Sequence, residues 1–418
     1  MFSIRPFART ITTRRANVVI VLILMTSAIA ISWTCSGLLT SRLIADDFAN
    51  VWFGSDCNFI YKQVASRWSG EHYRARRHPL FPLLLTPAFW VANRLAGIPA
   101  ELFVRSVLAL AAAGSVVLFY VLSLKVTRGV ISALLWTCLF LGSSGHLFWC
   151  GALETFYLGV PSLLTPFVVI AALRKTKYLE VALLWSIVFS FSVTLTNVMS
   201  GIASAASVKP LRDVWCIVKT AVCVLLVATA VQVKIIPASR DGMWFLPYIR
   251  DELRWIKPSP TESLVSRPLL ALTSGVIVPE VTVLDEPPAD GSSPYRGLTV
   301  RLRYASYGVG GVVVWIVLLG LAVAYSASKF VRCSGLYLAV ALVAAGQVVL
   351  HTIYGSETFL YSAHYAPVLI LFSAYACRTR FRRIAVALAV ALLVIEIANN
   401  VPAFLWSADY VRTLAAAG

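Results

Sequence analysis

The sequence has 418 residues, of which 59% are hydrophobic and 13% charged, and its mean hydropathy is +0.80. This composition excludes a soluble globular protein and predicts a polytopic membrane protein. The formal net charge of +17 does not indicate nucleic-acid binding. Most of the excess of Lys and Arg over Asp and Glu lies in short loops between apolar segments. Basic residues there are typical of a topology signal and of contact with anionic membrane lipids.

The apolar segments predict an all-α protein with about eleven transmembrane helices. The first segment, residues 17–39, follows several arginines, which predicts a cytoplasmic N-terminus. Further spans are expected at 102–124, 129–149, 155–173, 178–196, 197–208, 214–236, 305–327, 334–353, 364–377 and 384–405. The span at 197–208 is too short to cross alone, so we expect it to pair with 178–196 as a broken or tilted hairpin. Every loop that this scheme assigns to the cytoplasm is basic.

Residues 79–96 are apolar but are not counted as a span. Counting them would place the basic cluster at 174–177 outside, and Pro79, Pro82 and Pro87 interrupt a helix. We expect an interfacial helix in the first outer loop; a kinked span is the alternative. The chain then divides into three regions, 1–236 with its outer loop 40–101, a long outer loop at 237–304, and C-terminal spans at 305–418.

Two adjacent acids, Asp46 and Asp47, follow the first span on the predicted outer side. A carboxylate at the lipid–water boundary can act as a general base for a substrate that stays anchored in the membrane. These two residues are therefore the first catalytic candidates.

The same outer loop ends in a cationic cluster, Arg74, Arg76, Arg77 and His78, on the side where basic residues are normally scarce. Arginines bind phosphate through forked, charge-assisted hydrogen bonds, so the cluster predicts a phosphate site. The alternative is that the arginines extend to lipid headgroups.

Other outer residues complete the set of candidates. Glu154 lies at the outer end of a span, where it is either catalytic or a partner of the helix dipole. Glu357, Tyr361 and His364 have helical spacing and can share one face. Arg296 and Arg301 in the long outer loop can help to hold a phosphate. No P-loop, dinucleotide fingerprint, HExxH or GxSxG occurs, so soluble nucleotides and serine or zinc hydrolysis have no support.

These features resemble the GT-C superfamily of integral membrane glycosyltransferases. Proteins of that superfamily have a first helix followed by a large outer loop that begins with one or two acids and contains interfacial helices, often after a His-Pro. Here the matching residues are Asp46-Asp47 and His78-Pro79-Leu80-Phe81-Pro82-Leu83-Leu84, with Glu154 as the second acid in the next outer loop. The resemblance covers residues 1–236.

The resemblance implies an inverting transfer of a sugar from a polyprenyl-phosphate donor to an acceptor hydroxyl on a lipid, glycan or protein. An acid after the first helix, either Asp46 or Asp47, would act as base, and cations would stabilise the leaving phosphate. The setting is expected to be a bacterial inner membrane with the site facing outside. Asp46, Asp47 and Glu154 offer the oxygen ligands that Mg²⁺ or Mn²⁺ accept, but the arginines can neutralise phosphate without a metal, so the need for a divalent cation is left open.

Two other classes stay as alternatives. An O-antigen-type polymerase or ligase also combines about a dozen spans with a long outer loop, but does not need an acid pair after the first helix. A lipid or solute transporter would have intramembrane charges along a pathway and often repeated halves; Glu396 is an intramembrane charge of that kind, and no repeat is visible.

Overall fold

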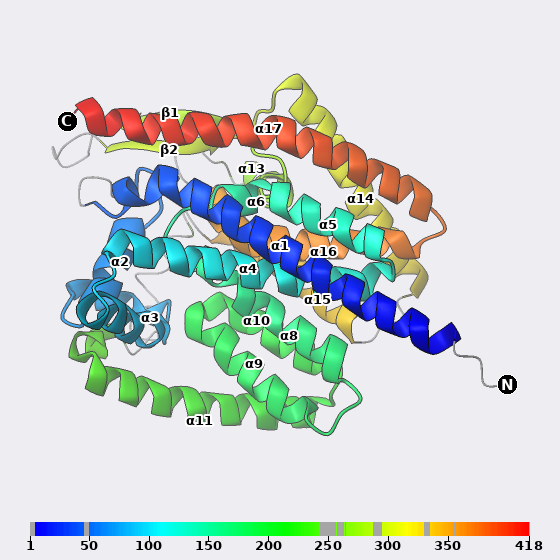
Figure 1. Cartoon of the computed structure of the whole chain (residues 1–418), viewed down its shortest axis with the longest axis horizontal. Helices are drawn as coiled ribbons and strands as arrows, with labels where there is room; N and C mark the ends of the chain where they lie inside the picture. Colours follow the sequence, from blue (N-terminus) through cyan, green and yellow to red (C-terminus); the bar gives the residue numbers. More distant parts are fainter. Residues whose placement is uncertain are drawn as a thin grey trace.

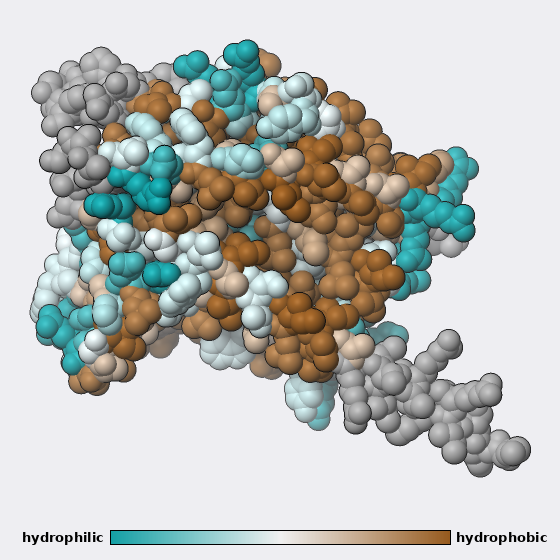
Figure 2. Space-filling model, turned by 45° about the horizontal axis from the view of Figure 1, so that its top comes forward, coloured by the Kyte–Doolittle hydropathy of each residue, from teal (hydrophilic) through white to brown (hydrophobic). Residues whose placement is uncertain are grey.

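The protein is a helical membrane protein whose long helices run side by side between two ends of one bundle (Figure 1). The computed structural model describes residues 5–45, 50–242, 256, 263, 265–286, 295–329, 335–354 and 357–417. Hydrophobic side chains cover much of the middle of the face seen in Figure 2, and hydrophilic side chains lie toward its ends. This distribution is the one that a lipid bilayer requires.

The N-terminal half of the chain is almost entirely helical. Its elements are α1 (Arg5–Leu43), α2 (Cys57–Ala65), η2 (Gly70–Arg76), α3 (Phe81–Trp90), the π-helix η3 (Val91–Leu95), α4 (Ala100–Thr127), α5 (Val130–Gly142), α6 (Ser144–Leu147), α7 (Thr155–Leu158), α8 (Val160–Leu173), α9 (Leu179–Val193), η4 (Leu195–Asn197), α10 (Val198–Ala206), α11 (Leu211–Ile235) and η5 (Pro237–Gly242).

The C-terminal half adds a small sheet to further long helices. Its elements are α13 (Ser266–Thr273), β1 (Glu280–Glu286), β2 (Tyr295–Arg301), α14 (Ser306–Lys329), α15 (Leu336–Ile353), η9 (Thr358–Tyr361), α16 (Ser362–Ser373), η10 (Ala374–Arg378) and α17 (Arg382–Ala417). The two strands pair antiparallel, with Val283 opposite Leu298. The sequence patterns did not predict this hairpin, which lies within the long loop 237–304.

Eight helical segments of the described residues are long and apolar enough to cross a membrane, rather than eleven. They are Ala16–Leu43, Ala100–Thr127, Thr155–Leu173, Leu211–Ile235, Ser306–Tyr325, Leu336–Ile353, Thr358–Arg378 and Arg382–Leu414. The remaining three predicted spans correspond to shorter helices, α5, α9 and α10. The nine-residue α10 packs against α9, as a broken hairpin would. Each of the three is shorter than the roughly 20 residues of a helix that spans a bilayer.

The two ends of the bundle differ in charge. At one end, the Arg378 side chain donates to the carbonyls of Lys125 and Val126. At this same end Lys209 pairs with Glu180, and Gly335 donates to Ser207. We call this the basic end. The opposite end carries α2, α3 and the hairpin of β1 and β2, and we call it the loop end (Figure 1).

The connection between α1 and α4 starts and finishes at the loop end. The two helices run antiparallel, because Arg105 donates to the Trp33 carbonyl at 3.1 Å and Tyr120 donates to Asn17 at 3.1 Å. Within the connection, α3 has only 10 residues and contains Pro87, and η3 follows it directly. A proline lacks the N–H of a helical hydrogen bond, and neither element is long enough to span. Residues 79–96 therefore do not form a membrane span.

Candidate functional site at the loop end

Asp46 and Asp47 lie outside the described residues. The chain that follows them is firmly attached to the bundle. Val51 accepts a hydrogen bond from the Leu298 amide of β2 at 2.8 Å, and the Trp52 indole donates to the Phe148 carbonyl at 3.1 Å. Trp52 and Phe53 are fully buried in a cluster of aromatic rings. Burial of two large aromatic side chains fixes this part of the first loop against the helices.

Glu154 is a buried acid of the loop end. It is the residue before α7, and its Oε1 accepts from the Thr155 amide at 2.8 Å and lies 3.0 Å from the Thr155 hydroxyl. Its Oε2 accepts from the Asp56 amide at 3.0 Å. Burial raises the pKa of Glu154 to about 7, and the positive charge of Arg74 opposes that rise. The carboxyl group can therefore carry a proton near neutral pH.

The arginines of the cationic cluster have different surroundings. Arg74 is buried, forms an ion pair with Asp56, and lies 5.6 Å from the Phe59 ring centroid. Arg76 is also buried, and its guanidinium lies 5.3 Å from the Tyr73 ring centroid. Arg77 is only partly buried, and its carbonyl accepts from the Leu195 amide at 3.0 Å. Of these three, Arg77 is the most open to an incoming ligand.

His78 connects the cluster to Glu154. Its Nδ1 donates to the Val193 carbonyl at 3.0 Å, and its Nε2 lies 3.1 Å from the Thr155 hydroxyl. Burial lowers the pKa of His78 to about 3, and the charge of Arg74 adds to that effect. The ring is therefore neutral when no ligand is present. Glu154 is thus brought beside His78 and Arg74 of the first loop, which lie far from it in sequence.

The third predicted cluster divides into two parts. Phe156 contacts Tyr361 and His364, with ring centroids 4.8 and 5.0 Å apart, and also lies 6.0 Å from the His78 ring. Tyr361 and His364 therefore adjoin the site. Glu357 instead accepts from the Thr299 hydroxyl of β2 at 2.9 Å, so it ties the hairpin to η9.

The two candidate arginines of the long loop, Arg296 and Arg301, both belong to β2. The side chain of Arg296 lies outside the described residues, and Arg301 is exposed at the end of β2, opposite Glu280. Among the described residues, no group of three or more His, Cys, Asp or Glu side chains is placed to hold a metal ion. The oxygens of Glu154 are already engaged with the donors named above.

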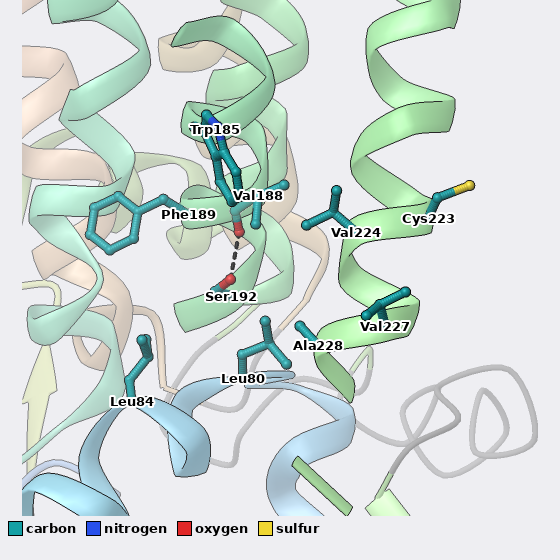
Figure 3. Close-up of a pocket in the computed structure, with 10 residues that line it drawn as sticks. All are labelled: Leu80, Leu84, Trp185, Val188, Phe189, Ser192, Cys223, Val224, Val227 and Ala228. Carbon is teal, nitrogen blue, oxygen red and sulfur yellow. Dashed lines mark hydrogen bonds between the residues drawn. The ribbon is translucent and has the colours of Figure 1, made fainter. Parts of the chain in front are cut away.

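An apolar groove opens beside the site, between α9 and α11, with a volume of about 620 Å³ (Figure 3). Val224 and Ala228 of α11 face Val188 and Ser192 of α9, and Leu80 and Leu84 close one end. The Leu80 amide donates to the Ser192 carbonyl at 2.9 Å, and the next carbonyl along α9, that of Val193, accepts from His78 Nδ1 at 3.0 Å, so the closed end adjoins the site.

Gln232 of α11 fixes the same closed end. Its side-chain amide donates to the Pro79 carbonyl at 3.0 Å and accepts from the Leu83 amide at 3.2 Å. Pro79 begins the apolar stretch of the first loop, so this one side chain joins the loop to the groove wall. Sequence reasoning missed Gln232, although a lone amide in the apolar run 214–236 is a visible signal. It also missed Thr155 and Phe156, which carry no distinguishing pattern.

No protein-family model matches the sequence, and neither curated proteins nor solved structures show significant similarity to the chain.

Proposed function

We propose that the protein is a membrane glycosyltransferase that moves a sugar from a polyprenyl-phosphate donor to an acceptor hydroxyl at the loop end, with inversion. The observation that carries the proposal is the junction at Leu80. On one side of it lies an apolar groove of about 620 Å³, and on the other lie Arg77, His78 and the buried acid Glu154. A lipid with an anionic head needs such a junction of apolar and cationic surfaces.

The groove suits a prenyl chain. Its lining is apolar apart from Ser192, whose hydroxyl donates to the Val188 carbonyl at 2.6 Å and is thereby satisfied within α9. The groove lies among helices that carry exposed apolar residues, so a lipid can enter it from the membrane. Because the chain would enter from lipid and not from water, its affinity for the groove would come from van der Waals packing against these side chains.

The sugar phosphate would then lie beyond Leu80, near Arg77. Cations next to a leaving phosphate stabilise the negative charge that develops when the sugar–phosphate bond breaks. The acceptor hydroxyl needs a base within hydrogen-bond reach, and we assign that role to Asp46 or Asp47 of the same loop. Attack from the face opposite the phosphate inverts the anomeric centre. The loop end would lie outside the cytoplasm, since the opposite end collects the basic loops.

Binding of polyprenyl phosphate to purified protein in nanodiscs tests the groove. Ala228→Trp fills the groove, and we expect it to weaken binding at least about tenfold, which corresponds to 1.4 kcal/mol. Leu226→Trp is the matched control, because Leu226 is exposed on the same helix and does not line the groove. Equal binding by both variants would place the lipid elsewhere.

Arg77→Ala tests the phosphate contact. Loss of one charge-assisted contact should cost about 1.5–3 kcal/mol in donor binding or transfer. Arg94→Ala is the control, since Arg94 is an exposed arginine of η3 in the same loop. If Arg77 only anchors lipid headgroups, both variants will behave like the wild type in donor kinetics.

A further inference from the structure

Glu154, Thr155 and His78 form a continuous chain of short contacts in the interior of the loop end. Glu154 Oε1 lies 3.0 Å from Thr155 Oγ1, which lies 3.1 Å from His78 Nε2. His78 Nδ1 lies 3.0 Å from the Val193 carbonyl. The three residues are 1%, 0% and 4% exposed, so water does not complete these contacts. Buried polar groups need partners that satisfy them.

The directions of these hydrogen bonds fix the number of protons that the three side chains share. The Val193 carbonyl can only accept, so His78 Nδ1 carries a proton. The single hydroxyl proton of Thr155 can serve Glu154 or His78, but not both. The other contact then needs a proton from a Glu154 carboxylic acid or from His78 Nε2. With Glu154 ionised and His78 neutral, one contact would bring two lone pairs together without a proton, at a cost of about 1–3 kcal/mol.

We propose that Glu154, Thr155 and His78 form a relay that holds one excess proton, and that Thr155 passes this proton between the carboxyl group and the imidazole. In one state Glu154 is a neutral acid that donates to Thr155, whose hydroxyl donates to His78 Nε2. In the other, Glu154 is a carboxylate that accepts from Thr155, and His78 is an imidazolium that donates to the Thr155 oxygen. The number of protons is the same in both states, so only their positions change.

The charged and titratable groups around the relay decide which state is populated. Asp56 and Cys57 lie on the Glu154 side, His364 lies on the His78 side, and Arg74 and Arg77 act on the same region. Burial disfavours both charged forms, and the two arginines disfavour an imidazolium. Without a ligand the proton therefore resides on Glu154, in agreement with the raised pKa of Glu154 and the lowered pKa of His78.

An anion near Leu80 would reverse this balance. His78 is two residues from Leu80, which closes the groove. A negative phosphate there attracts an imidazolium, and the Glu154 carboxylate forms as the proton leaves. Donor binding would thus convert a neutral acid into a carboxylate beside the Asp56 amide. This coupling rests on the proposed function, whereas the relay itself rests on the contacts alone. Thr155 is a positioning residue in this scheme.

Infrared spectroscopy of the full-length protein in nanodiscs, without any ligand, tests the relay. At pH 5 we expect a C=O stretch from a protonated Glu154, identified by its loss in Glu154→Gln. Thr155→Val should shift this band, because the acid loses its acceptor, and Thr155→Ser should restore it. Thr165→Val is the control, since among the described residues that hydroxyl bonds to the Pro161 carbonyl of its own helix and to no other group.

A second variant keeps the test decisive if Thr155→Val does not fold. In His78→Ala the Thr155 proton is released to Glu154, so the carboxylate is stabilised and the band should disappear at a lower pH than in the wild type. An unshifted band in Thr155→Val, or an unchanged titration midpoint in His78→Ala, would overturn the relay. Added polyprenyl phosphate should weaken the band; if it does not, while the variants behave as expected, the relay stands and the coupling to the proposed donor fails.

Discussion

The backbone N–H of Asp56 donates a 3.0 Å hydrogen bond to Glu154 Oε2, across 98 residues of sequence. This bond joins the first loop to the start of α7, and the Asp56 side chain extends the link through its ion pair with Arg74. Two predicted site residues, Glu154 and Arg74, are therefore held by an acid that no motif singles out. The bond also fixes where the first loop meets the interior of the bundle.

The Asp56–Arg74 pair predicts a large effect on stability. Asp56→Ala leaves the buried Arg74 charge without this carboxylate; because Asp56 is partly exposed, we expect a loss of more than about 1 kcal/mol in the free energy of unfolding but less than the ~3–5 kcal/mol of a fully buried pair. Adding Arg74→Met to Asp56→Ala should recover much of that loss. Asp409→Ala removes the carboxylate of the exposed Arg412–Asp409 pair and should cost less than about 1 kcal/mol. Denaturation in detergent, followed by tryptophan fluorescence, measures all three; equal losses for Asp56→Ala and Asp409→Ala would contradict the role of the buried pair.

Gln232 predicts a link between stability and donor binding. Gln232→Leu removes the partners of the Pro79 carbonyl and the Leu83 amide, and each unsatisfied backbone group should cost about 1–3 kcal/mol. The closed end of the groove should loosen, so that the affinity for polyprenyl phosphate falls together with the melting temperature. Thr229→Val serves as control, because the Thr229 hydroxyl bonds only to the Leu225 carbonyl of its own helix. A stable Gln232→Leu protein with normal affinity would refute this assignment.

Glu154 and His78 predict opposite dependences of stability on pH. The pKa of Glu154 is raised from 4.5 to about 7, so the folded protein binds more protons than the unfolded chain in that window, and stability falls as pH rises. The pKa of His78 is lowered from 6.5 to about 3, so the folded protein binds fewer protons there, and stability rises with pH. Between pH 4.5 and 6.5 the two effects oppose each other.

Single variants separate these effects in melting curves recorded from pH 4 to pH 8. In Glu154→Gln the rise caused by His78 should become visible up to about pH 6.5, and in His78→Gln the fall caused by Glu154 should be visible without the opposing rise. Identical pH profiles for the wild type and both variants would mean that neither group changes its protonation on folding.

The charge difference between the two ends predicts that the basic end faces the cytoplasm and the loop end faces outside. A cysteine at position 290, in the long loop, should react with an impermeant reagent on intact cells, and Lys177→Cys at the basic end should not. The exposed Cys216 and Cys223 would first be replaced by serine to remove background labelling. Labelling of residue 177 with protection of residue 290 would reverse the orientation.

Composition and charge predicted the helical membrane fold, because hydropathy and the basic loops follow directly from the bilayer. The prolines of residues 79–96 also predicted correctly that this stretch does not span. The same reasoning missed the hairpin β1–β2, although Val281-Thr282-Val283 and Leu298-Thr299-Val300 alternate apolar and polar residues as strands do. Of the eleven predicted spans, eight correspond to long apolar helices, and the other three, α5, α9 and α10, are apolar but short.

The candidate site could be predicted only in part. Residue type and side of the membrane indicated Glu154, Arg74 and His78 individually, but not that Thr155 joins Glu154 to His78 or that Asp56 pairs with Arg74. The Thr155–His78 contact and the bond from the Asp56 amide to Glu154 join residues 77 and 98 positions apart, and no local pattern in the sequence encodes them.

Transfer of a radiolabelled sugar from polyprenyl phosphate by the purified protein in lipid vesicles, with a membrane extract as acceptor and a panel of donor sugars, tests the proposed activity most directly. We expect the wild type to transfer from at least one donor, and Asp46→Asn or Asp47→Asn to lower the rate by at least about 100-fold while the protein stays folded. Asp213→Asn, in the first turn of α11, should transfer at the wild-type rate. Transfer from no donor by the wild type, or near-normal rates in both Asp46→Asn and Asp47→Asn, would contradict the assignment.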